Sequence, residues 1–376
     1  MKQFIYADNA ATTKLDIDAF EAMKPFLLDE YGNASQPYSF ARKPKQALKE
    51  ARGIIAQCIN SEPDEIYFTS GGTESDNWAI KGIAFHSQER KAIITSSFEH
   101  HAVLRACESV EMMGYPVAYI DPNISGCIEV DALESVITPQ TLLVSVMMSN
   151  NEIGTVQPIK DLVEVAHRYG SLFHTDAVQC VGHLPIDVKD LDIDLLSASA
   201  HKFNGPKGIG FLYIKRGTKI TPLLNGGAQE SGYRAGTENV AAIVAMAVAL
   251  KKNCDELTKN AEYILQLEDE LISTLMSERI EFHRNGNGTM LPGNLSLSFP
   301  GFEGESLLHR LDFMGIRVST GSACDSVNTH ISHVLQAIKA EEEVALGTIR
   351  ISLGKDNTFD DVKAITNAIC KIVNSR

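Results

Sequence analysis

The sequence contains no long apolar run. No window of its 376 residues approaches the roughly 18 uninterrupted apolar residues that a membrane-spanning helix requires. The amino-terminal stretch MKQFIYADNA reaches an acidic residue at Asp8 without the apolar core of a secretory signal. These absences argue against an integral membrane protein and predict a cytoplasmic protein with no membrane partner.

Cysteine offers neither a disulfide framework nor a metal site. Its seven positions are scattered, and no pair has the spacing of zinc ligands. We interpret six of them as small, buried apolar side chains, namely Cys58, Cys107, Cys127, Cys180, Cys254 and Cys370. The seventh, Cys324, lies among small polar residues instead.

Basic residues are also fewer than acidic residues. The formal net charge is -14, with 34 Lys and Arg against 48 Asp and Glu, which argues against nucleic acid or an anionic membrane as a partner. The composition is otherwise that of an ordinary globular protein, with 44% hydrophobic and 22% charged residues. The length is sufficient for one large domain and a smaller one.

Strand and helix patterns alternate from about residue 65 to 215. Short β-branched and apolar runs predict strands at 65–70, 91–95, 117–120, 142–148, 172–174, 195–199 and 210–214. The helical stretches between them predict an α/β fold whose large domain has a mainly parallel, doubly covered sheet. Short strands and turns replace this pattern toward the carboxyl terminus and predict a smaller α+β domain. We therefore expect a large domain over 15–255 and a small domain built from 1–14 and 256–376.

The most informative stretch is LLSASAHKFNGPKGIG, residues 195–210. An apolar strand ends at Ser199 and turn residues follow, which places Lys202 at the carboxyl end of a strand, where open α/β sheets bind ligands. A lysine that loses solvation there becomes an amine able to form a Schiff base. A solvated surface lysine is the commoner alternative, so the interpretation depends on what the other strand ends contribute.

Polar residues follow several other expected strand ends, at Thr73, His100, Asn151 and Asp176. If Lys202 holds an aldehyde cofactor, pyridoxal 5'-phosphate is the obvious one, and its ring nitrogen needs an anion. Asp176 is the candidate for that anion, His100 for a planar group against the ring, and Gln179 for the phenolic oxygen. The phosphate donors would be Gly72, Thr73, Ser199 and His201.

Each of these residues has an ordinary alternative role. Asp176 can be a helix N-cap, and His100 can be a surface or core histidine. Thr73 and Ser199 belong to residue types that are common in turns and caps. Their joint occurrence at successive strand ends favours a shared site for the set, although not for every member.

Several motifs carry a resemblance to a known family. In chain order they are FTSGGTESDN, SSFEHHAVL, MSNNEIGTVQP, HTDAVQ, SASAHKFNGPKGIG, RAGTENV, STGSACDS and TIRISLG. Together they resemble the cysteine desulfurases, which are fold-type I pyridoxal-phosphate enzymes of the aminotransferase class V family. The resemblance extends from YADNAATT to the last helical stretch, and the segment around Cys324 is its most specific part.

The resemblance implies the cofactor roles assigned above, with Lys202 as the Schiff-base lysine. It further implies that Thr237 reaches the cofactor phosphate of the partner subunit, and hence that the protein is a homodimer. It places Asn33, Asn151 and Arg350 at the carboxylate of the substrate, L-cysteine. The planar fork of Arg350 suits a carboxylate, and the alternative of a surface arginine on an edge strand is weakened by its apolar neighbours.

Cys324 lies in STGSACDS, a run of small polar residues that predicts a mobile loop. A surface cysteine without a function is the alternative that the residues alone leave open. The resemblance implies that the Cys324 thiolate attacks the substrate sulfur, which leaves L-alanine and an enzyme persulfide. A sulfur-acceptor protein, either an iron–sulfur scaffold or another sulfur carrier, would then take the sulfur.

The residues after Cys324 depart from the commonest pattern, because the stretch from Asp325 to Ile331 lacks the Leu-Glu-Pro expected in the commonest housekeeping desulfurases. The adjacent anion disfavours a thiolate, and the departure leaves the acceptor open. Selenocysteine lyase or cysteine-sulfinate desulfinase activity is the nearest alternative function, followed by an aminotransferase of the same family. A non-catalytic scaffold with the same fold is a further alternative, which the intact Lys202, Asp176 and Cys324 oppose.

Overall fold

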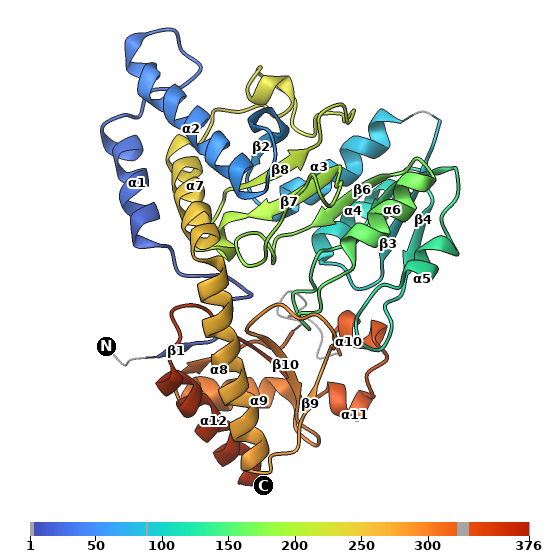
Figure 1. Ribbon diagram of the computed structural model, residues 1–376, viewed down its shortest axis with the longest axis vertical. Helices are drawn as coiled ribbons and strands as arrows, with labels where there is room; N and C mark the ends of the chain where they lie inside the picture. Colours follow the sequence, from blue (N-terminus) through green and yellow to red (C-terminus); the bar gives the residue numbers. More distant parts are fainter. Residues whose placement is uncertain (1–3, 88, 322–330, 376) are drawn as a thin grey trace.

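A seven-stranded sheet forms the larger part of the computed structural model, which describes residues 4–87, 89–321 and 331–375 (Figure 1). Its strand order is β2-β8-β7-β6-β5-β3-β4. All neighbouring strands are parallel except at β8, which runs antiparallel to both β2 and β7. The strands are β2 (Ile66–Thr69), β3 (Ala92–Ser96), β4 (Val117–Ile120), β5 (Thr141–Ser145), β6 (Leu172–Asp176), β7 (Leu195–Ser199) and β8 (Gly210–Ile214). The prediction of a mainly parallel sheet is confirmed.

Helices cover both faces of this sheet. On one side lie α3 (Gly72–His86) and α4 (His101–Glu111), and on the other lie α2 (Arg42–Cys58), α6 (Ile159–Arg168) and α7 (Val240–Asp255). Helix α1 (Ile17–Leu28) packs on α7, and the short α5 (Val130–Glu134), which the sequence analysis did not predict, packs on α6.

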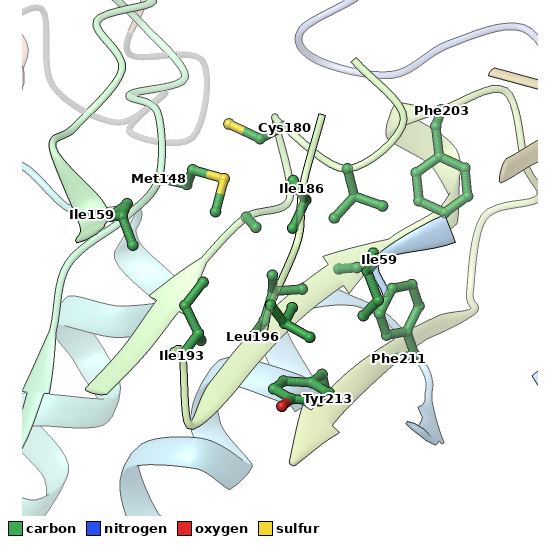
Figure 2. Packing of buried hydrophobic residues seen from close by; sticks show 14 of the residues in the cluster. Ile59, Met148, Ile159, Cys180, Ile186, Ile193, Leu196, Phe203, Phe211 and Tyr213 are labelled. Carbon is green, nitrogen blue, oxygen red and sulfur yellow. The ribbon is translucent and has the colours of Figure 1, made fainter. Parts of the chain in front are cut away.

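The two faces follow from the alternation of side chains along the strands. Leu195 of β7 and Leu212 of β8 belong to the apolar cluster under α3 and α4. Leu196 and Phe211, their chain neighbours, belong to the cluster under α2 and α7. Figure 2 shows the second cluster, with Leu196, Phe211 and Tyr213 along the two strands. A sheet that is buried on both faces needs apolar residues at nearly every strand position, as these runs have.

The carboxyl-terminal part forms a second, smaller layer below the sheet in Figure 1. Its three-stranded antiparallel sheet has the order β12-β10-β9, and a separate parallel pair joins β1 to β11. The strands are β1 (Ile5–Tyr6), β9 (His283–Arg284), β10 (Asn294–Ser298), β11 (Ile316–Arg317) and β12 (Thr348–Ser352). The helices are α8 (Leu257–Ser277), α9 (Gly304–Phe313), α10 (His333–Ala337), α11 (Glu342–Ala345) and α12 (Phe359–Asn374).

Most of the apolar packing of the smaller part is distinct from that of the large sheet. One cluster combines Ala7 with buried residues between Ile264 and Ile372, whereas two other clusters line the faces of the large sheet. Helices α7 and α8 meet at Glu256. The domain boundaries 15–255 and 1–14 with 256–376 stay a prediction. Val334, Leu335, Ile338 and Ala345 of the predicted small domain pack in the cluster of the large sheet. Among the described helices, none is long and apolar enough to cross a membrane.

Candidate active site

One pocket of about 570 Å³ collects most of the predicted site residues. It lies at the carboxyl ends of the parallel strands, which is where ligands bind in open α/β sheets. The predicted residues that line it are Gly72, Thr73, His100, Asn151, Asp176, Gln179, Ser199, His201, Lys202 and Arg350.

Lys202 ends the short 3-10 turn Ala200–Lys202 that follows β7. The strand that precedes the turn is entirely buried. The N–H groups of Phe203 and Gly205 both donate hydrogen bonds to the carbonyl of Ala200 and so stabilise the turn. The Lys202 Nζ donates hydrogen bonds to the carbonyl oxygens of Ala10 at 2.5 Å and Ala11 at 3.0 Å. Two neutral acceptors therefore hold the amine in the pocket.

Asp176 is the last residue of β6 and is only 6% exposed. Its Oδ1 accepts a hydrogen bond from the Val178 N–H at 2.9 Å. Burial raises the pKa of Asp176, while the nearby His100 and Lys202 act in the opposite direction. A buried carboxyl group of this kind gains most from a cationic N–H partner placed in the pocket beside it.

His100 begins α4 as its N-cap, and its Nδ1 accepts the Ala102 N–H at 3.1 Å. This contact fixes the plane of the ring and leaves the ring proton on Nε2. Burial lowers the pKa of His100, and Asp176 opposes that shift. The side chain is therefore a neutral, oriented, planar group in the wall of the pocket.

The amino terminus of α3 has an uncapped first turn, which is suited to bind an anion. Gly71, its N-cap, has φ of 146°, in the region that favours glycine, and no side chain caps the first turn. The unpaired N–H groups of that turn and the helix dipole both favour a bound anion. Ser199 and His201 line the same pocket, and burial lowers the pKa of His201 to about 4, so its imidazole is neutral.

Arg350 enters the pocket from β12 of the smaller sheet and is 3% exposed. Its Nη1 donates to the carbonyl of Asn151 at 3.0 Å, and its Nη2 donates to Asp8 Oδ1 at 2.8 Å. Its Nε has no hydrogen-bond partner within the described part of the chain. A buried guanidinium with spare donors is suited to a carboxylate ligand.

Three predicted residues are not brought to this pocket. Asn33 lies in the loop after α1, where its Oδ1 accepts the Ser35 N–H at 2.9 Å. Thr237 lines a neighbouring pocket, which shares Ser70 and Gly208 with the first. Cys324 lies outside the described residues. The roles of all three stay predictions.

The sequence analysis missed the part that the amino-terminal segment plays. The carbonyl of Ala10 accepts hydrogen bonds from both Lys202 and Gln179, and Asp8 pairs with Arg350. The polar, aperiodic composition of YADNAATT was the available signal, because such a segment has to find its backbone partners elsewhere.

Asp76 was also missed, although it lines the pocket from α3 and is 1% exposed. Its Oδ1 has no hydrogen-bond partner among the described residues and lies 3.6 Å from His174 Nε2. Burial raises the pKa of Asp76 well above its ordinary value, and Asp176 raises it further. Two buried carboxyl groups, both with a raised pKa, therefore lie in the same pocket. A search for polar residues that follow strand ends could not find Asp76, since Asp76 lies one turn inside α3.

Comparison with known proteins agrees with this geometry. The family model described as aminotransferase class-V matches residues 5–365. The chain is 47% identical over 375 residues to the cysteine desulfurase IscS of Dictyoglomus turgidum, covering 99% of this chain and 95% of that protein. A solved NifS-like protein superposes with a TM-score of 0.94 at 36% identity, with both chains covered completely.

A solved structure of SspA in complex with cysteine superposes with a TM-score of 0.84 at 38% identity, covering 94% of this chain and 100% of that one. The family match spans more than the pocket, since it includes both the large sheet and β12, from which Arg350 projects. The chain therefore belongs to the aminotransferase class-V family.

Proposed function

We propose that this protein is a pyridoxal-phosphate-dependent L-cysteine desulfurase, which converts L-cysteine to L-alanine and collects the sulfur as a persulfide on Cys324. The observation that carries the proposal is one pocket in which the Lys202 amine, the buried Asp176 carboxyl and the Arg350 guanidinium come together. The relatives named as cysteine desulfurases and the SspA complex with cysteine support this choice of substrate.

The donor set fits pyridoxal phosphate. Asp176 would face the ring nitrogen, the neutral ring of His100 would lie against the ring, and Gln179 would reach the phenolic oxygen. Gly72, Thr73, Ser199 and His201 would hold the phosphate at the amino terminus of α3, together with Thr237 of the partner subunit in a homodimer. When bound, the cofactor supplies an aldehyde for covalent attachment and an electron sink.

Lys202 has two tasks in this proposal. Its amine would hold the cofactor, and once the substrate amine has replaced it, it would take the proton from the substrate Cα. The carbonyls of Ala10 and Ala11 orient the amine for both tasks, since they bind its hydrogens without adding charge.

Arg350 would bind the substrate carboxylate, with Asn33 and Asn151 as further donors. The substrate sulfur then has to meet the Cys324 thiolate. A bond would form between the two sulfurs while the Cβ–S bond breaks and leaves its electron pair on Cβ. Cβ would then take one proton, and the Lys202 ammonium would return a proton to Cα, which gives alanine. The persulfide sulfur would pass to an acceptor protein in the cytoplasm, either an iron–sulfur scaffold or another sulfur carrier.

An absorbance spectrum of the purified protein, followed by a cysteine-dependent assay of alanine and sulfide, tests the proposal. We expect a cofactor band that is lost in Lys202→Ala, and alanine formation that is lost in Cys324→Ser. Full turnover by Cys324→Ser would refute the persulfide route. Faster turnover of selenocysteine or cysteine sulfinate by both wild type and Cys324→Ala would assign the site to those substrates instead.

A further inference from the structure

Cys58 and Cys254 lie together outside the active site. Cys58 is the last residue of α2, and Cys254 lies in the last turn of α7. These helices pack side by side (Figure 1), and both cysteines are half-buried against the same apolar cluster. The two thiols line the same pocket and shift each other's pKa. Helices far apart in the sequence therefore bring two cysteines to one site.

A surface pocket of about 300 Å³ gives access to both thiols. Figure 2 shows two of its apolar residues, Ile59 and Ile186. The remaining lining residues besides the cysteines are Gly182, Leu184, Pro185, Leu257 and Thr258. Among the described residues, no carboxylate lines this pocket.

The interaction makes the two thiols chemically unequal. It raises the pKa of Cys58 and lowers the pKa of Cys254. Lys251 favours the thiolate of Cys254 and Asp255 opposes it, and these two residues are paired with each other at 2.7 Å. Cys254 is therefore the nucleophile of the pair, since the thiolate is the reactive form.

We propose that Cys58 and Cys254 form a dithiol site that is reversibly oxidised to a disulfide by low-molecular-weight disulfides. The Cys254 thiolate attacks one sulfur of the small disulfide, forms a mixed disulfide and releases one small thiolate. Cys58 gives up its proton and attacks the Cys254 sulfur, which releases the second small thiol. The protein dithiol loses two hydrogens overall, and the small disulfide is reduced to two thiols.

The geometry favours this second step over a persistent mixed disulfide. The attacking Cys58 thiol lines the same pocket as Cys254, so the step is intramolecular and has a high effective concentration. The proposal does not depend on the desulfurase activity, because neither cysteine lines the active-site pocket.

Peptide mapping of the cofactor-loaded protein after incubation with oxidised glutathione tests the proposal. We expect a peptide pair that joins Cys58 to Cys254, with the loss of two hydrogens, and its disappearance after addition of dithiothreitol. In Cys58→Ser, Cys254 should instead retain one glutathione, because the resolving thiol is missing.

Cys370→Ser is the matched control. Cys370 is also half-buried, but burial rather than a second thiol raises its pKa, so this variant should form the same cross-link as wild type. The wild-type map is decisive even if a variant fails to fold. Glutathione that remains on wild-type Cys254, or two thiols that stay free after the incubation, would overturn the proposal.

Discussion

Arg350 illustrates how much of the site depends on single side chains from distant parts of the chain. Its guanidinium is buried, two of its nitrogens are bound to Asn151 and Asp8, and its Nε is left without a partner among the described residues. Such an arrangement orients the fork while leaving donors for a ligand.

Arg350→Lys should raise the KM for L-cysteine about 10- to 100-fold, because one ammonium cannot reproduce a bidentate contact. The cofactor absorbance band should remain. Arg317→Lys is the control, since Arg317 pairs with Asp312 at the surface and should leave KM unchanged. An unaltered KM in Arg350→Lys would remove Arg350 from the substrate carboxylate.

Glu99 is a second residue whose burial has a measurable consequence. It is fully buried, and its Oε1 accepts hydrogen bonds from Ser96 Oγ at 2.5 Å and from the Met147 N–H at 2.8 Å. Burial raises the pKa of Glu99 to about 8, against an ordinary value of about 4.3. The folded protein therefore binds this proton more tightly than the unfolded chain does.

The contribution of Glu99 to the free energy of unfolding is complete below its unfolded pKa and is lost as the pH rises toward 8. Glu99→Gln replaces the protonated acid by a neutral amide, so the decline of stability between about pH 5 and pH 8 should be smaller in this variant. Urea unfolding at both pH values measures the difference. Parallel declines in the two proteins would show that Glu99 is ionised in the folded state.

At the scale of the elements, the amino terminus of α3 depends on its uncapped Gly71-Gly72 turn. Gly71 has φ of 146°, and its Cα lies next to Gly210 of β8, where an added Cβ on Gly210 would come within 2.8 Å of it. The turn thus combines a conformation that favours glycine with close packing against a neighbouring strand.

Gly71→Ala should weaken retention of pyridoxal phosphate about 10-fold or more, since the strain of roughly 1–3 kcal/mol falls on the turn that would hold the phosphate. Titration of the cofactor into apoprotein measures the change. Gly114→Ala is the control, because Gly114 also has a positive φ, of 92°, but a Cβ added there would meet no described atom within 4 Å. Equal affinities in the two variants would mean that only general backbone strain is involved.

The elements also show what local sequence patterns can and cannot predict. The strands that end at Ser96, Asp176 and Ser199 have strong apolar or β-branched runs, so their ends and most pocket residues could be predicted. Strands β1 and β11 are two residues long, too short to leave a period. Their pairing, and the Asp8 contact beside it, join positions more than 300 residues apart, and no local pattern encodes such a contact.

At the scale of the whole molecule, the predicted homodimer can be tested by mixing subunits that carry different substitutions. Thr237 does not line the pocket that holds Lys202 of the same chain, which is consistent with a role in the partner's site. The sequence itself contains no pattern that distinguishes a residue serving its own subunit from one serving the partner, so that assignment came only from resemblance.

Mixing inactive Lys202→Ala and Thr237→Ala subunits should restore activity, because one site of each mixed dimer would combine an intact Lys202 with an intact Thr237 from the other chain. Reassembly from tagged subunits, followed by the alanine assay, measures this. Each variant alone is the baseline. If mixing restores nothing although the tags show that mixed dimers have formed, Thr237 serves its own subunit.

The contact between Asp8 and Arg350 has a consequence for the order in which the pocket is completed during translation. Lys202 and Asp176 leave the ribosome long before Arg350 does. The carbonyls of Ala10 and Ala11, which bind Lys202, are synthesised earlier still. The large sheet can form during translation, but the guanidinium that completes the pocket arrives only near the end of synthesis. A nascent chain that stalls before β12 would expose an amine and a carboxyl group in an unfinished cleft, and competence for substrate would begin only once translation had passed that strand.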